Sequence, residues 1–347
     1  SIAYSLGLKK RAVALETADI FLEGSVKHAV ECYKDMSWIA MRIAFNLGCM
    51  DKAGASDTAG FLSEDKIVSA VKNYSDMDWA SGMILDTIIR MNRDNALKAA
   101  DIFLEGSVKK AIHGYESVPR IAKYIISTLG VQNKDAALET AGVFHNDRIN
   151  ACVLGYGNIY WAARNVTDVI GGMRLDDALK AADIFMEDKI KETIMFYESL
   201  PRVARYIMSE LGHKNLDESL SIVDVLHEQK IIDTVISYKD KPSIAEYIAF
   251  DLGVREKHEA LEAADIFTDD KIRDVVFSYE SMPEIVNDIL YDLGCMRKDS
   301  ALKAAEKFNE SEVRDQLMSC KDHDSAKRLV SDLTWSLVDD NEEILEF

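Results

Sequence analysis

Histidines and cysteines are the first residues to consider for metal binding or catalysis. The five cysteines lie far apart without C-x-x-C spacing, and the seven histidines follow no common pattern. Two His-Glu pairs, His227-Glu228 and His258-Glu259, could contribute metal ligands, but they are 31 residues apart. No Ser-His-Asp or Cys-His set stands out, and the glycine pairs lack the context of a phosphate loop. We therefore expect no catalytic residue, no metal and no cofactor.

Tryptophan and arginine recur at a fixed spacing that suggests binding. Successive members of this series are 41 residues apart: Trp38, Trp79, Arg120, Trp161 and Arg202. The same series continues with polar residues, which predicts a solvent-accessible position. These residue types dominate interface energetics. With helices about 8–10 Å apart, the first four would form a stripe about 30 Å long, enough for about nine residues of extended chain. Alternatively, the tryptophans fill gaps between repeats.

A second series places carboxylates at the same step. Its acidic members include Asp19, Asp101, Asp183, Asp224 and Asp265. One interpretation is that they accept local hydrogen bonds from the backbone or from tyrosines. The other is that they form an acidic row that binds a basic ligand.

The step of 41 residues extends through the whole chain. It relates seven tyrosines: Tyr33, Tyr74, Tyr115, Tyr156, Tyr197, Tyr238 and Tyr279. A glycine series shares it, with Ile89 as the one internal exception. Within residues 176–216 the apolar spacing is helical and predicts three helices. We expect Ser199 to cap the third helix, Pro201 to lie in its first turn and Gly212 to end it in a left-handed conformation.

Such a unit has too few apolar residues to fold alone, so its neighbours must complete the core. We expect an all-α chain that forms one α-solenoid domain over residues 1–347. Residues 1–11 match the last helix of a repeat and predict an upstream repeat. The predicted repeats are 12–52, 53–93, 94–134, 135–175, 176–216, 217–257, 258–298 and the capping repeat 299–339, followed by an acidic tail, 340–347.

A 41-residue repeat with one short and two longer helices resembles the armadillo repeat and, more loosely, the HEAT repeat. In armadillo proteins that bind basic peptides, a third-helix tryptophan is followed one turn later by an asparagine that holds the peptide backbone. Trp161 and Asn165 match this spacing, whereas Arg42 and Met83 follow the two earlier tryptophans. The resemblance therefore implies a contact site at Trp161 and Asn165.

The His-Glu pairs resemble those of HEAT-repeat iron hydroxylases, whose sites use several such pairs at equivalent repeat positions. Here the two pairs are out of phase with the 41-residue step. A metal-dependent hydroxylase is therefore kept as an alternative function.

Charge and composition indicate the type of partner. The chain of 347 residues has 41 Lys and Arg and 60 Asp and Glu, which gives a formal charge of -19. This charge repels nucleic acid and favours a basic protein or peptide. No apolar run of membrane-spanning length and no signal peptide occur, and the scattered cysteines suggest reduced thiols in the cytoplasm.

From these observations we expect a non-catalytic scaffold that binds a basic or extended protein segment on its inner face. A structural unit that self-associates through its N-terminal end is a further alternative.

Overall fold

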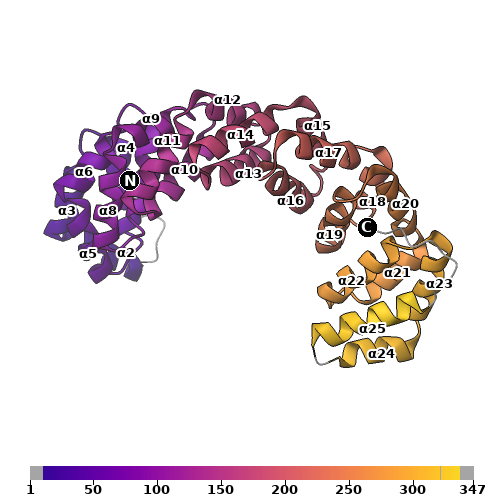
Figure 1. The fold of residues 1–347 in the computed structure, drawn as a ribbon. Helices are drawn as coiled ribbons and strands as arrows, with labels where there is room; N and C mark the ends of the chain where they lie inside the picture. Colours follow the sequence, from indigo (N-terminus) through magenta and orange to yellow (C-terminus); the bar gives the residue numbers. More distant parts are fainter. Residues whose placement is uncertain (1–10, 321, 337–347) are drawn as a thin grey trace. The chain divides into compact units, whose positions relative to one another are not determined.

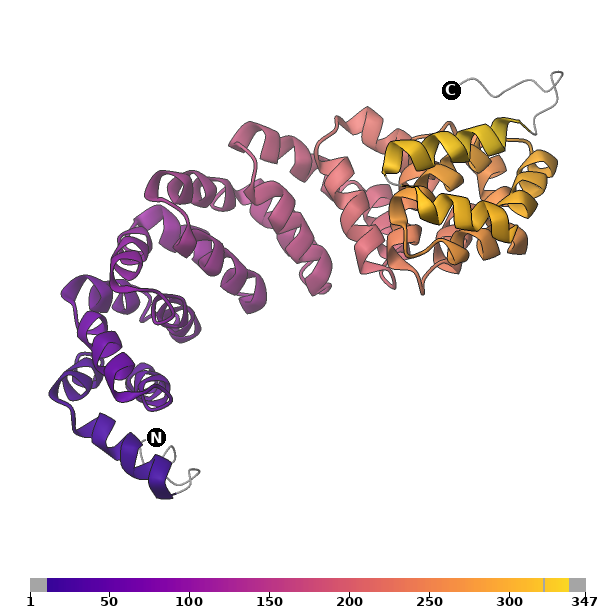
Figure 2. The ribbon, with the colours of Figure 1, turned by 90° about the horizontal axis from the view of Figure 1, so that it is seen from below.

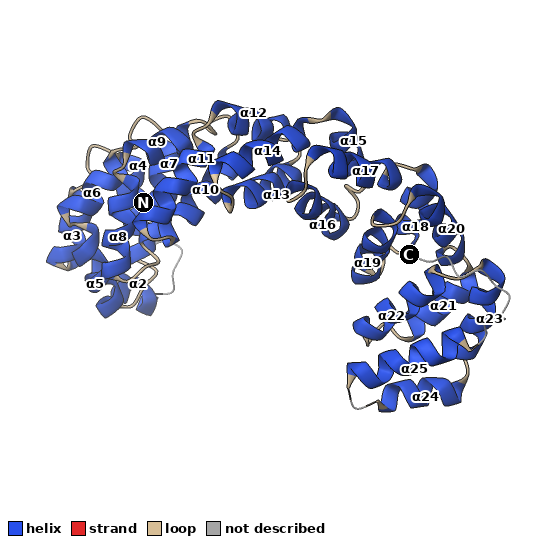
Figure 3. Ribbon diagram, in the orientation of Figure 1, coloured by secondary structure: helices blue, strands red, loops and turns tan. Residues whose placement is uncertain are grey.

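A computed structural model describes residues 11–320 and 322–336, and helices dominate this part of the chain (Figure 3). It contains 24 helices, and no strand occurs among the described residues. The expected all-α class is confirmed. The acidic tail and the predicted N-terminal association surface, apart from Arg11, lie outside the described residues.

The chain divides into two compact units, Ser1–Leu179 and Lys180–Phe347. Their boundary falls within helix α14, Leu175–Met186, and so inside the predicted repeat 176–216. Each unit is described separately below.

Three kinds of helix alternate along the chain. The first helices are α2 (Arg11–Leu22), α5 (Lys52–Leu62), α8 (Arg93–Phe103), α11 (Lys134–Phe144), α14, α17 (Leu216–Leu226), α20 (Lys257–Phe267) and α23 (Lys298–Phe308). The second helices are α3 (Gly24–Glu31), α6 (Asp65–Lys72), α9 (Gly106–His113), α12 (Asp147–Gly155), α15 (Asp188–Phe196), α18 (Gln229–Ser237), α21 (Asp270–Ser278) and α24 (Ser311–Ser319). The third helices are α4 (Ser37–Leu47), α7 (Asp78–Ile88), α10 (Pro119–Val131), α13 (Tyr160–Gly171), α16 (Pro201–Gly212), α19 (Pro242–Gly253), α22 (Pro283–Gly294) and α25 (His323–Trp335).

Within each unit the helices of one repeat contact helices of the next repeat. Third helices contact one another, as α7 does α10 and α16 does α19. Second helices contact the next first helix, as α6 does α8 and α18 does α20 (Figures 1 and 2). The third helices of a unit therefore share one surface, and the second helices lie away from it.

Local sequence explains how the helices begin. Side chains of Asp51, Asn92, Asn133 and Asn215 cap four of the first helices by accepting a backbone N–H bond. Pro201 begins α16 as predicted, but the predicted cap at Ser199 is wrong. Leu200 occupies the N-cap position and makes no side-chain cap. The fixed φ of proline suits the first helical position without such a bond.

The recurring glycine allows close packing rather than an unusual backbone conformation. No described glycine has a positive φ, so the predicted left-handed stop at Gly212 is wrong. A Cβ added at Gly171 would lie 2.7 Å from Cζ of Phe144, and one at Gly294 would lie 2.8 Å from Cζ of Phe267. The aromatic ring of the preceding first helix thus occupies the space that a side chain would need.

The exception in the glycine series fits this explanation. Ile89 replaces the glycine in the repeat whose first helix carries Leu62 in place of the phenylalanine. Both residues are buried. Gly253 follows Leu226, and a Cβ there would lie at an ordinary 3.5 Å from it. A glycine is therefore required only where a phenylalanine faces it.

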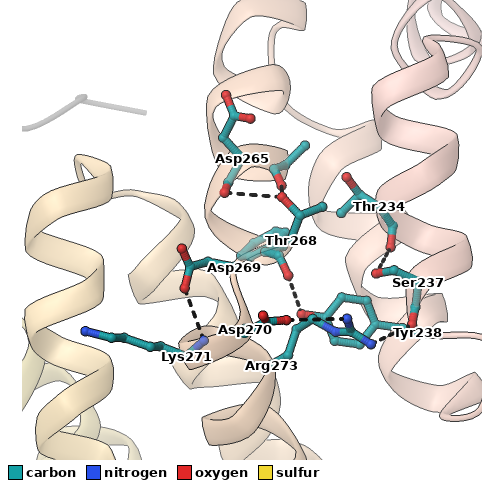
Figure 4. Close-up of polar contacts among 11 residues, drawn as sticks. Thr234, Ser237, Tyr238, Asp265, Thr268, Asp269, Asp270, Lys271 and Arg273 are labelled. Atoms are coloured by element: carbon teal, nitrogen blue, oxygen red, sulfur yellow. Dashed lines mark hydrogen bonds and ion pairs between the residues drawn. The ribbon is translucent and has the colours of Figure 1, made fainter.

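The buried tyrosines join neighbouring repeats. All seven members of the tyrosine series are fully buried. The Tyr238 hydroxyl donates a 2.5 Å hydrogen bond to the carbonyl of Phe267 in the next first helix. From the next second helix, Arg273 donates to the carbonyl of Ser237 at 3.2 Å, and its guanidinium lies 5.6 Å from the Tyr238 ring centroid (Figure 4). At this junction, side chains thus satisfy carbonyl groups at helix ends of the neighbouring repeat.

Candidate functional site

The tryptophan and arginine series occupies the same position in successive third helices. Trp38, Trp79, Arg120 and Trp161 are each the second residue of a third helix in the first unit. These four helices contact one another in succession. Arg202 holds the same position in α16 of the second unit. The tryptophans are half-buried, whereas both arginines are exposed.

Trp38 packs into a space that its neighbour leaves open. A Cβ added at Gly82 on α7 would lie 2.1 Å from Cη2 of Trp38, so the indole covers this glycine. The guanidinium of Arg42 lies 5.8 Å from the Trp38 ring centroid and forms an ion pair with Asp86. This tryptophan therefore contributes to packing between α4 and α7.

Trp161 shares part of this behaviour. Its indole nitrogen, like that of Trp38, is covered and has no hydrogen-bond partner in the described part of the chain. Asn165 lies one turn further along α13 and is half-buried. The spacing that resembles an armadillo peptide site is thus present on one helix, but with the indole N–H facing inward.

Three residues of the acidic row are held by the protein itself. Asp101, Asp224 and Asp265 form ion pairs with Lys66, Lys189 and Lys230 of the preceding second helices. Asp19 is exposed, and Asp183 is half-buried. The ion pairs link repeats, so at these three positions a basic ligand would have to compete with a lysine.

The lysine and acid positions vary together. Where the acidic series has Gly60 or Gly142, the lysine series has Ser25 or Ser107. This correlation supports a structural role for the acidic row.

A groove of about 420 Å³ lies on the third helices α16, α19 and α22 of the second unit. Aromatic side chains form much of its wall. The rings of Tyr206 and Phe250 meet edge to face with centroids 5.8 Å apart, and Tyr247 lies 6.1 Å from Phe250. Phe250 is 41% exposed.

Charged and polar side chains complete the groove. Arg202 forms an ion pair with Glu246 and donates a 3.0 Å hydrogen bond to the Ser243 hydroxyl. Glu280 pairs with Lys241, which comes from the turn before α19. Asn287 also lines the groove, and its amide makes no hydrogen bond to any described residue. The groove thus offers aromatic faces and an amide that can both donate and accept, together with two carboxylates that are already paired with Arg202 and Lys241.

Of the groove residues, the sequence analysis identified only Arg202. Phe250 has a signal that could have been found, because its position in the repeat is also occupied by Phe45 and Tyr291. All three are exposed, at 41–51%. Exposed aromatic residues at one repeat position are candidates for contact, and of these three only Phe250 lines the groove.

Buried charges lie near the C-terminal ends of α19 and α22. Arg255 holds Asp251 through two 2.9 Å hydrogen bonds and donates to the Gly294 carbonyl at 3.1 Å. Burial raises the pKa of Asp251, and Arg255 opposes this shift. These residues link two repeats and do not line the groove.

Asp292 is a further buried carboxyl group. Burial raises its pKa to about 6, and nearby Asp288 adds to the effect, whereas a hydrogen bond from Ser331 and the charge of Lys327 oppose it. A carboxyl group with this pKa changes its protonation near neutral pH.

The His-Glu pairs occupy separate environments. Nδ1 of His227 lies 2.9 Å from the Thr193 hydroxyl, whereas His258 is exposed and lies 3.9 Å from Glu256. Among the described residues, no group of three or more His, Cys, Asp or Glu side chains is placed to hold a metal ion. None of the described helices has both the length and the apolar character needed to span a membrane.

No family model matches the chain, and no curated protein matches it significantly.

Proposed function

We propose that the chain is an α-solenoid of armadillo- or HEAT-like repeats and acts as a non-catalytic scaffold. The recurring order of three helices and the contacts between equivalent helices support the architecture. Stacked repeats present a continuous helical surface, which suits the binding of extended protein segments.

The groove on α16, α19 and α22 is the observation that carries the proposed binding function. Its aromatic rings suit the aliphatic stem of a lysine or arginine, and Glu246 and Glu280 suit the charged end, which would compete with Arg202 and Lys241 for them. Asn287 can bond both a peptide N–H and a carbonyl. We therefore assign this groove to an extended peptide that carries basic side chains.

Peptide binding with single-residue variants tests this assignment. The probe is a fluorescein-labelled peptide of about ten residues in which lysine alternates with leucine, and its anisotropy is measured against protein concentration. We expect Phe250→Ala to weaken binding at least tenfold, because a buried aromatic contact contributes about 2 kcal/mol or more to binding. Glu246→Gln should weaken binding and reduce its dependence on salt.

Tyr291→Ala provides the matched control. Tyr291 holds the position of Phe250 in the next repeat and is similarly exposed, but it does not line the groove. Its replacement should leave the affinity within twofold. Equal losses for the two variants, with unchanged melting temperatures, would place the peptide elsewhere.

A further inference from the structure

A pair of arginines in the first unit replaces an ion pair found in the second. Arg202 on α16 pairs with Glu246, which lies 44 residues further along on α19. Arg120 holds the position of Arg202 on α10, and 44 residues further along α13 carries Arg164 in place of the glutamate. The two helices are in contact. The first unit thus has two cations at the positions where the second unit has a cation and an anion.

Aromatic rings hold these two guanidinium groups. The Arg120 guanidinium lies 5.5 Å from the ring centroid of Tyr160 on α13, and that of Arg164 lies 5.0 Å from the ring centroid of Tyr124 on α10. Each arginine therefore reaches across to the other helix. A guanidinium that stacks on a ring keeps its N–H edges available for a carboxylate, and its orientation is set before a ligand arrives.

The surrounding charges leave this surface positive. Arg120, Arg164 and the neighbouring Lys123 are exposed, and none of the three forms an ion pair with a described residue. Helix α10 contains no acidic residue, and α13 contains only Asp168, which lies beside Tyr124 and leaves the three cations in excess. On α7, Asp86 is already paired with Arg42, and Asp78 lies in the first turn. In a chain of formal charge -19, unpaired cations gathered at one place are unexpected.

We propose that the surface formed by Arg120, Lys123, Tyr124, Tyr160 and Arg164 binds an acidic, extended segment of a partner protein. A carboxylate can bridge the N–H edges of the two arginines through charge-assisted hydrogen bonds. Apolar side chains of the segment would contact the exposed ring of Tyr160, which is 37% exposed. The net negative charge of the chain repels every anion at long range, and it repels a nucleic acid more than a short acidic peptide because a nucleic acid carries a charge on each nucleotide. This binding goes beyond the groove on α16, α19 and α22 and takes a ligand of opposite charge.

Arg164→Glu tests the proposal without threatening the fold. The substitution restores the charge pattern of Arg202 and Glu246, so the melting temperature should stay the same or rise. The probe is a labelled twelve-residue peptide in which glutamate alternates with leucine. At low salt we expect the unmodified protein to bind it, and Arg164→Glu to weaken binding at least tenfold. Binding should also weaken as salt is raised, because the contacts are exposed.

Two controls make the result specific. Lys98→Glu makes the same change in charge at an exposed residue of α8 and should leave the affinity within twofold. The lysine-leucine peptide, which reports on the separate groove, should bind Arg164→Glu as it binds the unmodified protein. The proposal is overturned if the acidic peptide fails to bind, if Lys98→Glu weakens binding as much as Arg164→Glu, or if a single-stranded oligonucleotide binds in preference to the peptide.

Discussion

The hydroxyl of Tyr197 donates a 3.0 Å hydrogen bond to the backbone carbonyl of Leu226, the last residue of the next first helix. The hydroxyl of Tyr74, at the equivalent position, is buried without a partner among the described residues. The corresponding carbonyl, that of Phe103, instead accepts a 3.1 Å bond from the side chain of Asn73. One tyrosine series therefore contains both a bonded and an unbonded hydroxyl in similar packing.

This difference predicts unequal effects of removing the hydroxyl. Tyr197→Phe should lower the free energy of unfolding by about 1–2 kcal/mol, because it leaves a buried carbonyl without its partner. Tyr74→Phe should change the free energy by less than about 0.5 kcal/mol or stabilise the protein, because it removes a buried hydroxyl that bonds nothing. Urea denaturation of both variants measures this, and equal losses would contradict the assigned hydrogen bond.

Gly82 should tolerate no side chain. Because a Cβ there would meet the ring of Trp38, Gly82→Ala must displace the indole, and we expect a loss of about 1–3 kcal/mol. Gly142→Ala serves as the control, since a Cβ there meets nothing within 4 Å, and it should stabilise α11 by about 0.5–1 kcal/mol. Thermal denaturation separates the two. A neutral Gly82→Ala would mean that Trp38 is free to move into solvent.

Ser107 and Gly142 occupy positions that carry an ion pair in other repeats, and two substitutions can introduce that pair here. Ser107→Lys with Gly142→Asp reproduces the pair that Lys66 forms with Asp101. We expect a coupling energy of about 0.2–1 kcal/mol, because the pair is exposed, and a decrease at high salt. A double-mutant cycle with both single variants measures it, and zero coupling at low salt would show that the two positions do not meet.

Asp292 should make stability depend on pH. Its pKa in the folded protein, about 6, lies above the ordinary value for an aspartate, so the folded state binds the proton more tightly. Its contribution to the free energy of unfolding therefore falls as pH rises from about 4 to about 6. Asp292→Asn removes this penalty and should stabilise the protein by about 1–3 kcal/mol at pH 7. Melting temperatures at pH 4.5 and 7.5 test it, and a gain confined to pH 4.5 would reverse the assigned direction.

Much of the helical pattern could be predicted because every repeat position is seen several times. The tyrosine series indicated burial, and Pro201 indicated a helix start, since these depend on local chemistry and on a shared environment. The role of the glycine series was missed. Glycine can be required either for a positive φ or for close packing. Only its correlation with Phe or Leu 27 residues earlier distinguishes these two roles.

The candidate sites were less predictable, because they depend on contacts between different repeats. Residues at one repeat position do not share identical neighbours: Trp38 is half-buried because Gly82 makes room for it. The groove around Phe250 requires three adjacent helices, and single positions do not reveal it. The arginine pair, Arg120 and Arg164, can be recognised only by comparison with the ion pair of Arg202 and Glu246. That comparison requires the contact between α10 and α13.

The two kinds of bond between repeats place different demands on any rearrangement of the gene. A tyrosine that bonds a backbone carbonyl finds the same acceptor in whichever repeat follows, so a duplication or deletion of 41 residues preserves that bond. Ion pairs between side chains are not preserved in this way. Deletion of residues 53–93 would place Ser25, which has no charge, opposite Asp101. Hydrogen bonds to backbone acceptors therefore allow one repeat to replace another. Ion pairs form only between repeats whose side chains match, so they indicate which repeats were inherited as neighbours.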